Sequence, residues 1–169
     1  GLLPTPSKSH YTFNLRDFSR VVQGVLLQEP SDQFQNKPSV MRLWTHEALR
    51  VFGDRLTDDT DRQWMCDHCS AMCKEVFKCD FQSEFDHIRP SDETETGYGT
   101  LRRLFWGDYM TPADEDERPY AEVPDLQQLQ ERTEEALSDF NSASKKPMEL
   151  VMFMFAIEHV SRIARVLRM

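Results

Sequence analysis

Four cysteines are the residues of this chain most suggestive of metal chemistry. Cys66, Cys69, Cys73 and Cys79 are clustered, with His68 between the first two, rather than spread along the chain like disulfide staples. The spacing C-x2-C-x3-C with a nearby histidine is compatible with zinc ligands. The same spacing places the first three cysteines on one face of a helix within "WMCDHCSAMCKEVF". No turn residue separates the pair and no second ligand pair follows, so we favour reduced thiols in a core over a zinc site.

Two pairs of neighbouring residues could suggest acid–base chemistry. His46 precedes Glu47, and Glu158 precedes His159. Adjacent positions of a helix point about 100° apart, so neither pair is expected to form a shared site. We predict solvated or capping polar groups at these positions. No serine or cysteine lies in a recognisable nucleophile motif, and we therefore assign no catalytic residue and no metal ligand.

The chain lacks the loops that hold nucleotide phosphates. None of its six glycines lies in a G-x-x-x-x-G-K-[ST] stretch, and the glycine loops of kinases and dinucleotide-binding folds are also absent. The stretch "MFMFAIEH" has some similarity to a strand that ends in a magnesium-binding acidic pair, but it lacks the first acid and continues in helical register. We therefore predict a buried helix there and no ATPase activity for this chain alone.

Composition and charge narrow the classes of partner. The 169 residues are 39% hydrophobic, enough for a modest core, and 29 acidic against 20 basic residues give a net charge of −9. Such a charge argues against nucleic acid and against an anionic membrane as the main partner. The longest apolar run, Leu150 to Ile157, falls far short of the roughly 20 residues that cross a bilayer. With no secretion signal at the N-terminus, we expect a cytosolic protein.

The spacing of apolar residues predicts the helices on which these cysteine, histidine and glutamate side chains would lie. After an extended start at residues 1–9, which contain two prolines, a first helix begins at the N-cap Asn14, has Asp17 in its first turn and ends near Pro30. Its predicted apolar stripe is Leu15, Phe18, Val21, Val22, Val25 and Leu26.

Further helices follow the same rules. Pro38 and Ser39 are predicted to open a second helix, with Val40, Leu43, Trp44, Ala48, Val51, Phe52 and Leu56 as its apolar positions. Asp58 or Asp59 is predicted to cap a third, whose buried side would be Trp64, Met65, Cys69, Met72, Cys73, Val76 and Phe77.

The second half of the chain is less regular. Helical periodicity fades over residues 81–120, where "LRRLFWGDYM" is expected to dock as a short helix or turn between exposed loops. It resumes at Asp125 with Leu126, Leu129, Ala136, Leu137 and Phe140. A last helix is predicted from about Pro147 to the end, where Arg162, Arg165 and Arg168 offset the negative helix terminus. We find no convincing strand, and predict an all-α helical bundle.

Several ordered blocks of sequence resemble one family. These blocks are "LLPTPSKSHYTFNLRDFSRVVQGVL", "LWTHEALRVFGDRLTDDTDRQWM", "LRRLFWGDYM", "YAEVPDL" and "FNSASKKPMELVMFMFAIEHVSRIARVLR". Together they resemble the dynein heavy chain, at the lid subdomain of the third AAA+ module of its motor ring. The form "YTFNLRDFSRV" is more similar to ciliary and flagellar dyneins than to cytoplasmic transport forms.

The resemblance implies a piece of a larger ring. It implies a helical lid portion at 1–87, an irregular connection with a short docked segment at 88–123, and the leading helices of the fourth module at 124–169. In the family, the lid begins upstream of Leu2 and the next phosphate loop follows "RVLR", so we expect an excised segment. The implied cofactor is ATP or ADP with Mg²⁺ in the intact ring, and none for the segment alone.

The resemblance also implies a role for two arginines. The family places a lid arginine, called sensor 2, on the helix that matches "NLRD", so Arg16 is assigned to contact the terminal phosphate, with Arg20 as reserve. Residues i and i+4 share a helix face, and guanidinium groups bind phosphate oxygens through charge-assisted bonds. The alternative is a surface ion pair of either arginine with Asp17 or a facing carboxylate.

The implied function is ATP-coupled movement along microtubules in cilia and flagella. Implied partners are the adjacent AAA+ modules, the microtubule and the dynein intermediate and light chains, and the implied locations are the cytoplasm, the cytoskeleton and the axoneme. Two alternatives remain. One is a stand-alone helical interaction module that binds protein through an exposed segment, Leu104 to Trp106, without nucleotide coupling. The other is a zinc-binding helical domain.

Overall fold

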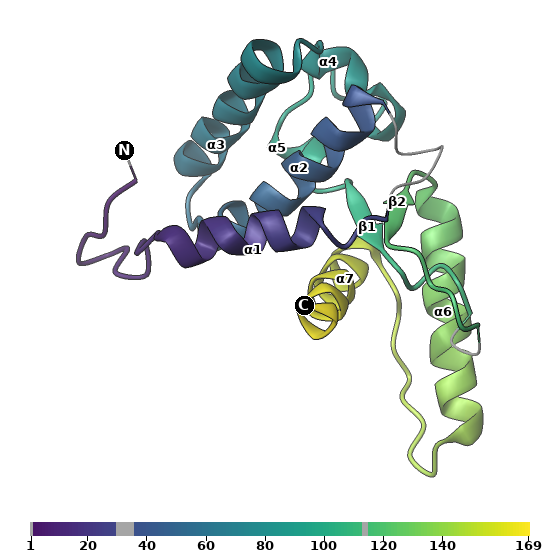
Figure 1. The fold of residues 1–169 in the computed structure, drawn as a ribbon. Helices are drawn as coiled ribbons and strands as arrows, with labels where there is room; N and C mark the ends of the chain where they lie inside the picture. Colours follow the sequence, from purple (N-terminus) through teal and green to yellow (C-terminus); the bar gives the residue numbers. More distant parts are fainter. Residues whose placement is uncertain (1, 30–35, 113–114) are drawn as a thin grey trace. The chain divides into compact units, whose positions relative to one another are not determined.

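The computed structural model describes residues 2–29, 36–112 and 115–169 (Figure 1). These residues form two compact units, Gly1–Leu104 and Phe105–Met169. Each unit has a hydrophobic cluster of its own. The three-part division predicted from the sequence stays a prediction, but Ile88, Leu101 and Leu104 pack in the first core.

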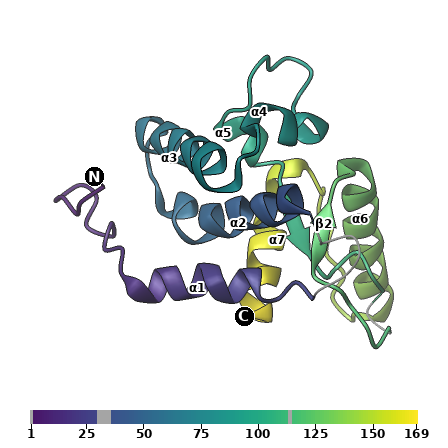
Figure 2. The ribbon, with the colours of Figure 1, turned by 45° about the horizontal axis from the view of Figure 1, so that its top comes forward.

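The first unit begins with an irregular arm, residues 2–14, and continues as short and medium helices. Their bounds are α1 Leu15–Val25, α2 Lys37–Val51, the 3-10 turn η2 Gly53–Arg55, α3 Asp59–Met72, the π-helical turn η3 Cys73–Phe77, α4 Phe81–Glu84, the 3-10 turn η4 Asp86–Ile88 and α5 Tyr98–Leu101. Figures 1 and 2 show α1 running beside α2, against which it packs.

The helix starts of this unit follow from side-chain caps. The Asn14 carboxamide accepts a hydrogen bond from the Arg16 backbone N–H at 2.8 Å, and Asp17 accepts one from the Asn14 N–H at 3.0 Å. This reciprocal capping box confirms the predicted start of the first helix. Asp58 caps α3 as predicted, whereas α2 begins at Lys37 because Asn36 caps it. The predicted stop at Pro30 lies outside the described residues.

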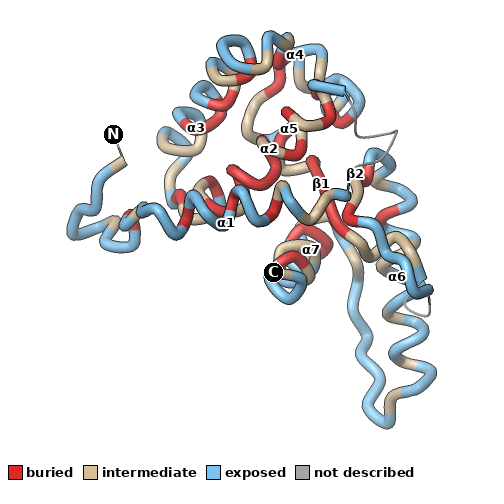
Figure 3. Tube along the Cα trace, viewed as in Figure 1, coloured by how far each residue is buried: buried red, intermediate tan, exposed pale blue. Residues whose placement is uncertain are grey.

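The first core lies between α2, α3 and the short helices that follow. Its fully buried members include Tyr11 of the arm, Met41 and Leu49 of α2, and Phe85 and Leu101 beyond α3. Burial of apolar surface from all these elements provides the main stabilisation of the unit. Figure 3 shows the buried positions concentrated along α2 and along one side of α3.

Cys66, Cys69 and Cys73 are buried in this core as free thiols, which confirms their predicted packing as small apolar residues. Burial raises the pKa of Cys66 to about 11 and the pKa of Cys73 to about 12. The pKa of Cys69 is raised further by the same desolvation. At neutral pH these thiols are therefore protonated. Cys79 is partly exposed.

Two predicted apolar faces are less buried than expected. Along α1, Val21 is buried, but Leu15 is 83% exposed and Phe18 and Leu26 are also exposed. The predicted apolar stripe is thus only partly covered, because α1 packs on α2 with Val21 and Gly24 buried. On the third helix, Trp64 and Val76 were expected in the core and are exposed.

The pair His46 and Glu47 also corrects a prediction. Both residues are buried, and the His46 Nδ1 and Glu47 Oε1 atoms lie 3.0 Å apart. The prediction of solvated, separate groups failed because the Glu47 side chain is long enough to reach back to the neighbouring imidazole. Gly24 of α1 lies directly against the Glu47 carboxylate, where a Cβ atom would come within 1.8 Å of Oε2.

The second unit joins a small sheet to two helices. Strands β1 Phe105–Gly107 and β2 Ala121–Val123 pair antiparallel, with Phe105 opposite Val123. They are followed by α6 Leu126–Ala143 and α7 Met154–Arg168. Phe105, Val123, Leu129 and Ile157 form the buried centre of this unit.

The sheet corrects two expectations from the sequence. No strand was expected, yet residues 105–107 form one because pairing with 121–123 satisfies their backbone while Phe105 and Trp106 are buried. The alternative of an interaction module required Leu104, Phe105 and Trp106 to be exposed, and all three are buried. The segment 101–110, predicted to dock as a short helix or turn, therefore contains a strand, and its residues 104–106 are buried.

The last helix begins later than predicted. It starts at Met154 instead of about Pro147, and residues 144–153 run outside any helix. The Asn141 side chain donates to the Met148 carbonyl at 2.9 Å and accepts from the Met148 N–H at 2.8 Å, which occupies both backbone groups outside a helix. The earlier helix is capped by Asp125, the residue at which helical periodicity was expected to resume.

The all-α class is confirmed, with the two-stranded sheet as a minor addition. No helix in the described ranges is both long and apolar enough to span a bilayer.

Replacing Gly24 by alanine is expected to destabilise the first unit by about 1–3 kcal/mol, the range for overpacking a filled interior. The new methyl group would displace a carboxylate that is 0% exposed and bonded to His46. Urea unfolding would measure the loss. Gly97→Ala is the matched control, because a Cβ atom there meets nothing within 4 Å. Equal stability of the two variants would contradict the close packing of α1 on Glu47.

The buried thiols are expected to resist alkylation in the folded protein. A thiol with a pKa of about 11 is roughly one part in a thousand thiolate at pH 8, and burial also blocks the reagent. Iodoacetamide followed by mass spectrometry should label Cys79 first, and Cys66, Cys69 and Cys73 only after unfolding. Rapid labelling of Cys69 in the native protein would contradict its place in the core.

Candidate functional site

Arg16 and Arg20 both lie on the exposed side of α1. The guanidinium of Arg20 is 3.6 Å from Asp17 Oδ1, so the ion pair considered as the alternative from the sequence is present for this residue. The Arg20 side chain remains 65% exposed. In the parts of the chain that the structure describes, no carboxylate pairs with the Arg16 guanidinium. Arg16 is therefore the arginine whose charge is available to an added anion.

Asp17 lies at the centre of the polar contacts of α1. It is buried, and its Oδ2 atom accepts hydrogen bonds from the Asn14 backbone N–H and from Arg55 Nη1, both at 3.0 Å. Loss of a cation beside a buried carboxylate is strongly destabilising, so the Arg55 guanidinium stabilises the buried charge of Asp17. The acidic group also offsets the positive end of α1, which makes the helix terminus itself a poor anion site.

Arg55 ties the arm to the corner between α2 and α3. Its Nη2 donates to the carbonyl of His10 at 2.6 Å and to that of Thr12 at 3.3 Å. Its guanidinium lies 4.4 Å from the ring centroid of Phe13, a cation–π contact. In return, the His10 Nε2 atom lies 2.8 Å from the Arg55 carbonyl oxygen.

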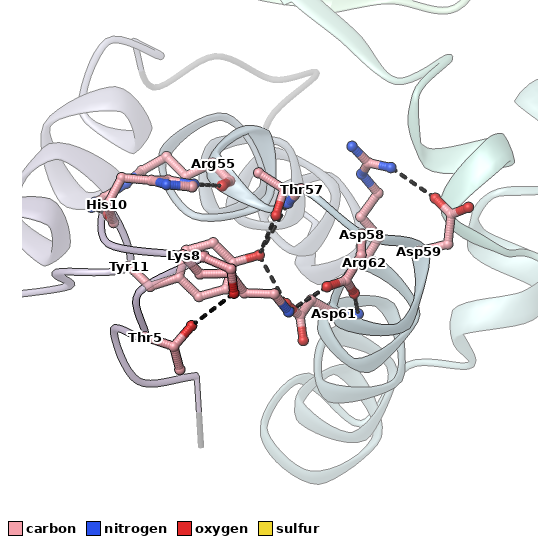
Figure 4. A network of polar contacts seen from close by, with 11 residues as sticks. Thr5, Lys8, His10, Tyr11, Arg55, Thr57, Asp58, Asp59, Asp61 and Arg62 are labelled. Atoms are coloured by element: carbon pink, nitrogen blue, oxygen red, sulfur yellow. Dashed lines mark hydrogen bonds and ion pairs between the residues drawn. The ribbon is translucent and has the colours of Figure 1, made fainter.

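A second group of contacts holds the arm against the start of α3, as Figure 4 shows. The Tyr11 hydroxyl donates to Asp61 at 2.8 Å and accepts from the Thr57 backbone N–H at 3.0 Å. Lys8 pairs with both Asp58 and Asp61. The ring of Tyr11 is buried, so this anchor combines apolar packing with directional bonds.

The charges of this anchor stabilise one another. Hydrogen bonds to Asp58 and Asp61 raise the pKa of Lys8 above its usual value, so it stays protonated at all ordinary pH. The hydrogen bond from Lys8 is also the main reason that the pKa of Asp58 is lowered. The single positive charge of Lys8 thus offsets part of the negative charge of Asp58 and Asp61.

An apolar cavity of about 340 Å³ lies within the first unit. It is lined by Leu2 and Phe13 of the arm, Phe18 and Val21 of α1, Trp44, Ala48, Phe52 and Leu56, and Trp64, Met65, His68 and Cys69 of α3. At this cavity the rings of Trp64 and His68 stack, with centroids 5.3 Å apart. The lining is mostly apolar and carries no guanidinium or ammonium group, so it is poorly suited to a phosphate.

The other residues singled out from the sequence do not form a site. Across residues 2–29, 36–112 and 115–169, no three His, Cys, Asp or Glu side chains are placed to hold one metal ion. His159 Nδ1 lies 2.8 Å from the Phe155 carbonyl oxygen, and Arg162 is 3.5 Å from Glu158. His159 is thus a solvated group as predicted, whereas Glu158 is buried.

Sequence reasoning missed the residues that hold α1 in place. Arg55 lies 38 positions from Asp17, and Tyr11 lies 50 from Asp61, so no local pattern connects them. A weak signal exists, because a polar-tipped aromatic such as Tyr11 in a proline-rich arm is typical of a docked segment. Arg55 has no comparable signal in its sequence neighbourhood.

This arrangement can bind an anion without moving its backbone. α1 presents two guanidinium groups one turn apart on an exposed side, and its first turn is fixed by Asp17 and Arg55. Each guanidinium can make two parallel bonds to phosphate or carboxylate oxygens. Beside the arginines, the exposed side chains of Leu15, Phe18 and Leu26 offer apolar surface for a further protein part.

Comparison with known proteins agrees with this architecture. Residues 1–88 match the family described as the AAA+ lid domain. Human dynein axonemal heavy chain 12 is 47% identical over 169 residues, and human dynein axonemal heavy chain 3 is 49% identical over 168 residues. Mouse dynein axonemal heavy chain 1 is 38% identical over 167 residues.

These similarities cover 99% of the chain but only 4–5% of each relative. The chain thus spans about one twentieth of the length of the heavy chains that it resembles. The lid match covers the arm, α1, α2, α3 and the turns up to Ile88, which is the part that carries Arg16, Arg20 and their anchor. The chain therefore belongs to the AAA+ lid domain family, and along nearly its whole length it is a relative of axonemal dynein heavy chains.

Proposed function

We propose that this chain is the nucleotide-responsive lid and inter-module connector of a dynein motor ring, with Arg16 as the contact to the terminal phosphate. The observation that carries the proposal is the exposed, unneutralised guanidinium of Arg16 on a helix whose first turn is anchored through Asp17 and Arg55. Arg20 is the reserve contact, because part of its charge is already shared with Asp17.

The physical basis is that the lid makes one more contact when the γ-phosphate is present than when it is absent. A γ-phosphate held by the large part of the same module would bond to Arg16 and thereby join lid and large part. After hydrolysis and release that bond is lost, and the two parts separate as rigid bodies. A capped α1 with a buried carboxylate in its first turn would repel phosphate from the helix terminus, so the arginine side chain makes the contact.

The connector role concerns the second unit. In this proposal, α6 and α7 lead into the next AAA+ module, so the adjacent modules of the same heavy chain are the direct partners. We place the ring itself in ATP-driven movement along microtubules in cilia and flagella. The microtubule and the intermediate and light chains are then partners through the whole heavy chain, and the axoneme and cytoplasm are its locations.

The cofactor of the proposed ring is ATP or ADP with Mg²⁺. The described residues offer no group of metal ligands, and the sequence has no phosphate loop. Mg²⁺ and most of the nucleotide would therefore be held by protein outside this chain. What this chain contributes is the guanidinium that senses whether the terminal phosphate is present.

The rival function, a stand-alone interaction module, depended on an exposed aromatic segment. Leu104, Phe105 and Trp106 are instead buried, which removes the surface that favoured it. We retain the lid proposal alone.

Arg16→Ala in an intact heavy-chain ring is expected to weaken ATP binding at the site under this lid about tenfold. That is the loss expected for one charge-assisted hydrogen bond to phosphate. ADP binding should change less than twofold, since the contact is to the terminal phosphate. Fluorescent ATP and ADP analogues, titrated into a ring whose other sites are disabled, would measure both affinities.

Two further variants make that experiment specific. Arg20→Ala should weaken ATP binding less than Arg16→Ala does, because the Arg20 guanidinium is shared with Asp17. Arg62→Ala is the control, because this arginine of α3 pairs with the exposed Asp59. An ATP affinity unchanged by Arg16→Ala would remove the phosphate contact from this helix.

A further inference from the structure

We propose that Arg55 is a positioning residue for the phosphate contact: it holds the first turn of α1 in place and hence determines where the Arg16 guanidinium lies. This inference rests on the proposed function, because it assumes that Arg16 reads the terminal phosphate. The residue belongs to η2, at the corner between α2 and α3, and not to α1 itself.

One side chain links two parts of the chain in this corner. The Arg55 Nη1 atom is 3.0 Å from Asp17 Oδ2 in the first turn of α1. The Nη2 atom donates to the carbonyls of His10 and Thr12 in the arm, at 2.6 and 3.3 Å. The arm and the helix therefore meet at a single guanidinium.

The position of Arg55 is itself fixed. Its backbone N–H donates to the Phe52 carbonyl at 3.3 Å, and its own carbonyl lies 2.8 Å from His10 Nε2. Its guanidinium faces the Phe13 ring. The corner between α2 and α3 therefore holds the start of α1 in a fixed orientation through directional contacts.

The packing of α1 makes these contacts necessary. In the first turn of α1, Leu15 and Phe18 are exposed, so burial of apolar surface restrains that turn little. Asp17 is buried, and its Oδ1 atom also lies 3.6 Å from Arg20. Without the Arg55 guanidinium, Asp17 would lose its bond to the corner between α2 and α3, so the first turn of α1, and Arg16 with it, would be held less firmly.

The contacts require a guanidinium and not merely a positive charge. Arg55 uses its two terminal nitrogens toward different partners while its plane lies against an aromatic ring. Lysine offers one compact ammonium group and cannot reproduce this fork. Arg55→Lys therefore keeps the charge beside Asp17 but loses the geometry, which separates positioning from simple neutralisation.

The test compares Arg55→Lys with Arg16→Ala, singly and together, in the intact heavy-chain ring. Arg55→Lys is expected to weaken binding of a fluorescent ATP analogue roughly tenfold and binding of the ADP analogue less than twofold. The double variant should bind ATP no more weakly than Arg16→Ala alone, since both substitutions remove the same contact. Arg62→Lys is the matched control and should leave both affinities unchanged.

Each other outcome has a definite meaning. If Arg55→Lys weakens ATP and ADP binding equally, or adds fully to Arg16→Ala, Arg55 has only a general structural role and the inference is wrong. If Arg16→Ala is defective while Arg55→Lys binds ATP normally, the inference fails and the proposed function stands. If Arg16→Ala itself binds ATP normally, the proposed function fails and the inference falls with it.

Discussion

The first unit depends on one buried carboxylate. Asp17 closes the capping box of α1, pairs with Arg55 and lies within reach of Arg20. A carboxylate removed from water is tolerated only where cations and N–H donors surround it, so its three partners fix the first turn of the helix in direction as well as in place. Apolar packing alone would not give such a direction, because the hydrophobic effect is not directional.

Polar contacts also fix the direction of the arm, over a longer stretch of chain. Lys8 and Tyr11 hold residues 8–11 against the start of α3, while Arg55 holds residues 10–13 and the helix that follows. Both anchors converge on the segment between α2 and α3, so the chain that leads into α1 and the corner beneath it form one polar assembly (Figure 4). The arginines of α1 are thus presented from a fixed base although the helix itself is little buried.

How far the sequence predicts this fold depends on the range of the interactions. Asn14 was correctly predicted as a cap, and Asp58 was one of the two candidates for the cap of α3, because a cap bonds to backbone two or three residues away. The contact of Arg55 with Asp17 is formed only when distant segments pack, and no spacing rule reveals it.

Periodicity has a different limit, because it shows which side of a helix is apolar but not what covers that side. The first helix has the apolar stripe that its spacing predicts, yet Leu15 and Leu26 on that stripe are exposed. Conversely, the segment Leu104 to Trp106, which the rival interaction module required to be exposed, is buried. The positions of Arg16 and Arg20 on one side of a helix follow from their spacing, whereas the difference between them follows only from where Asp17 lies.

That difference decides what the pair of arginines can do. An added phosphate at Arg20 must compete with a carboxylate already 3.6 Å away, whereas Arg16 meets an anion without first giving up a partner among the described residues. The charge of Asp17 therefore makes two chemically identical groups unequal. A helix held at its start by polar contacts and exposed along its apolar side can be joined to a second protein surface there, while in the proposed lid the anchored turn favours Arg16 over Arg20 as the contact to the phosphate.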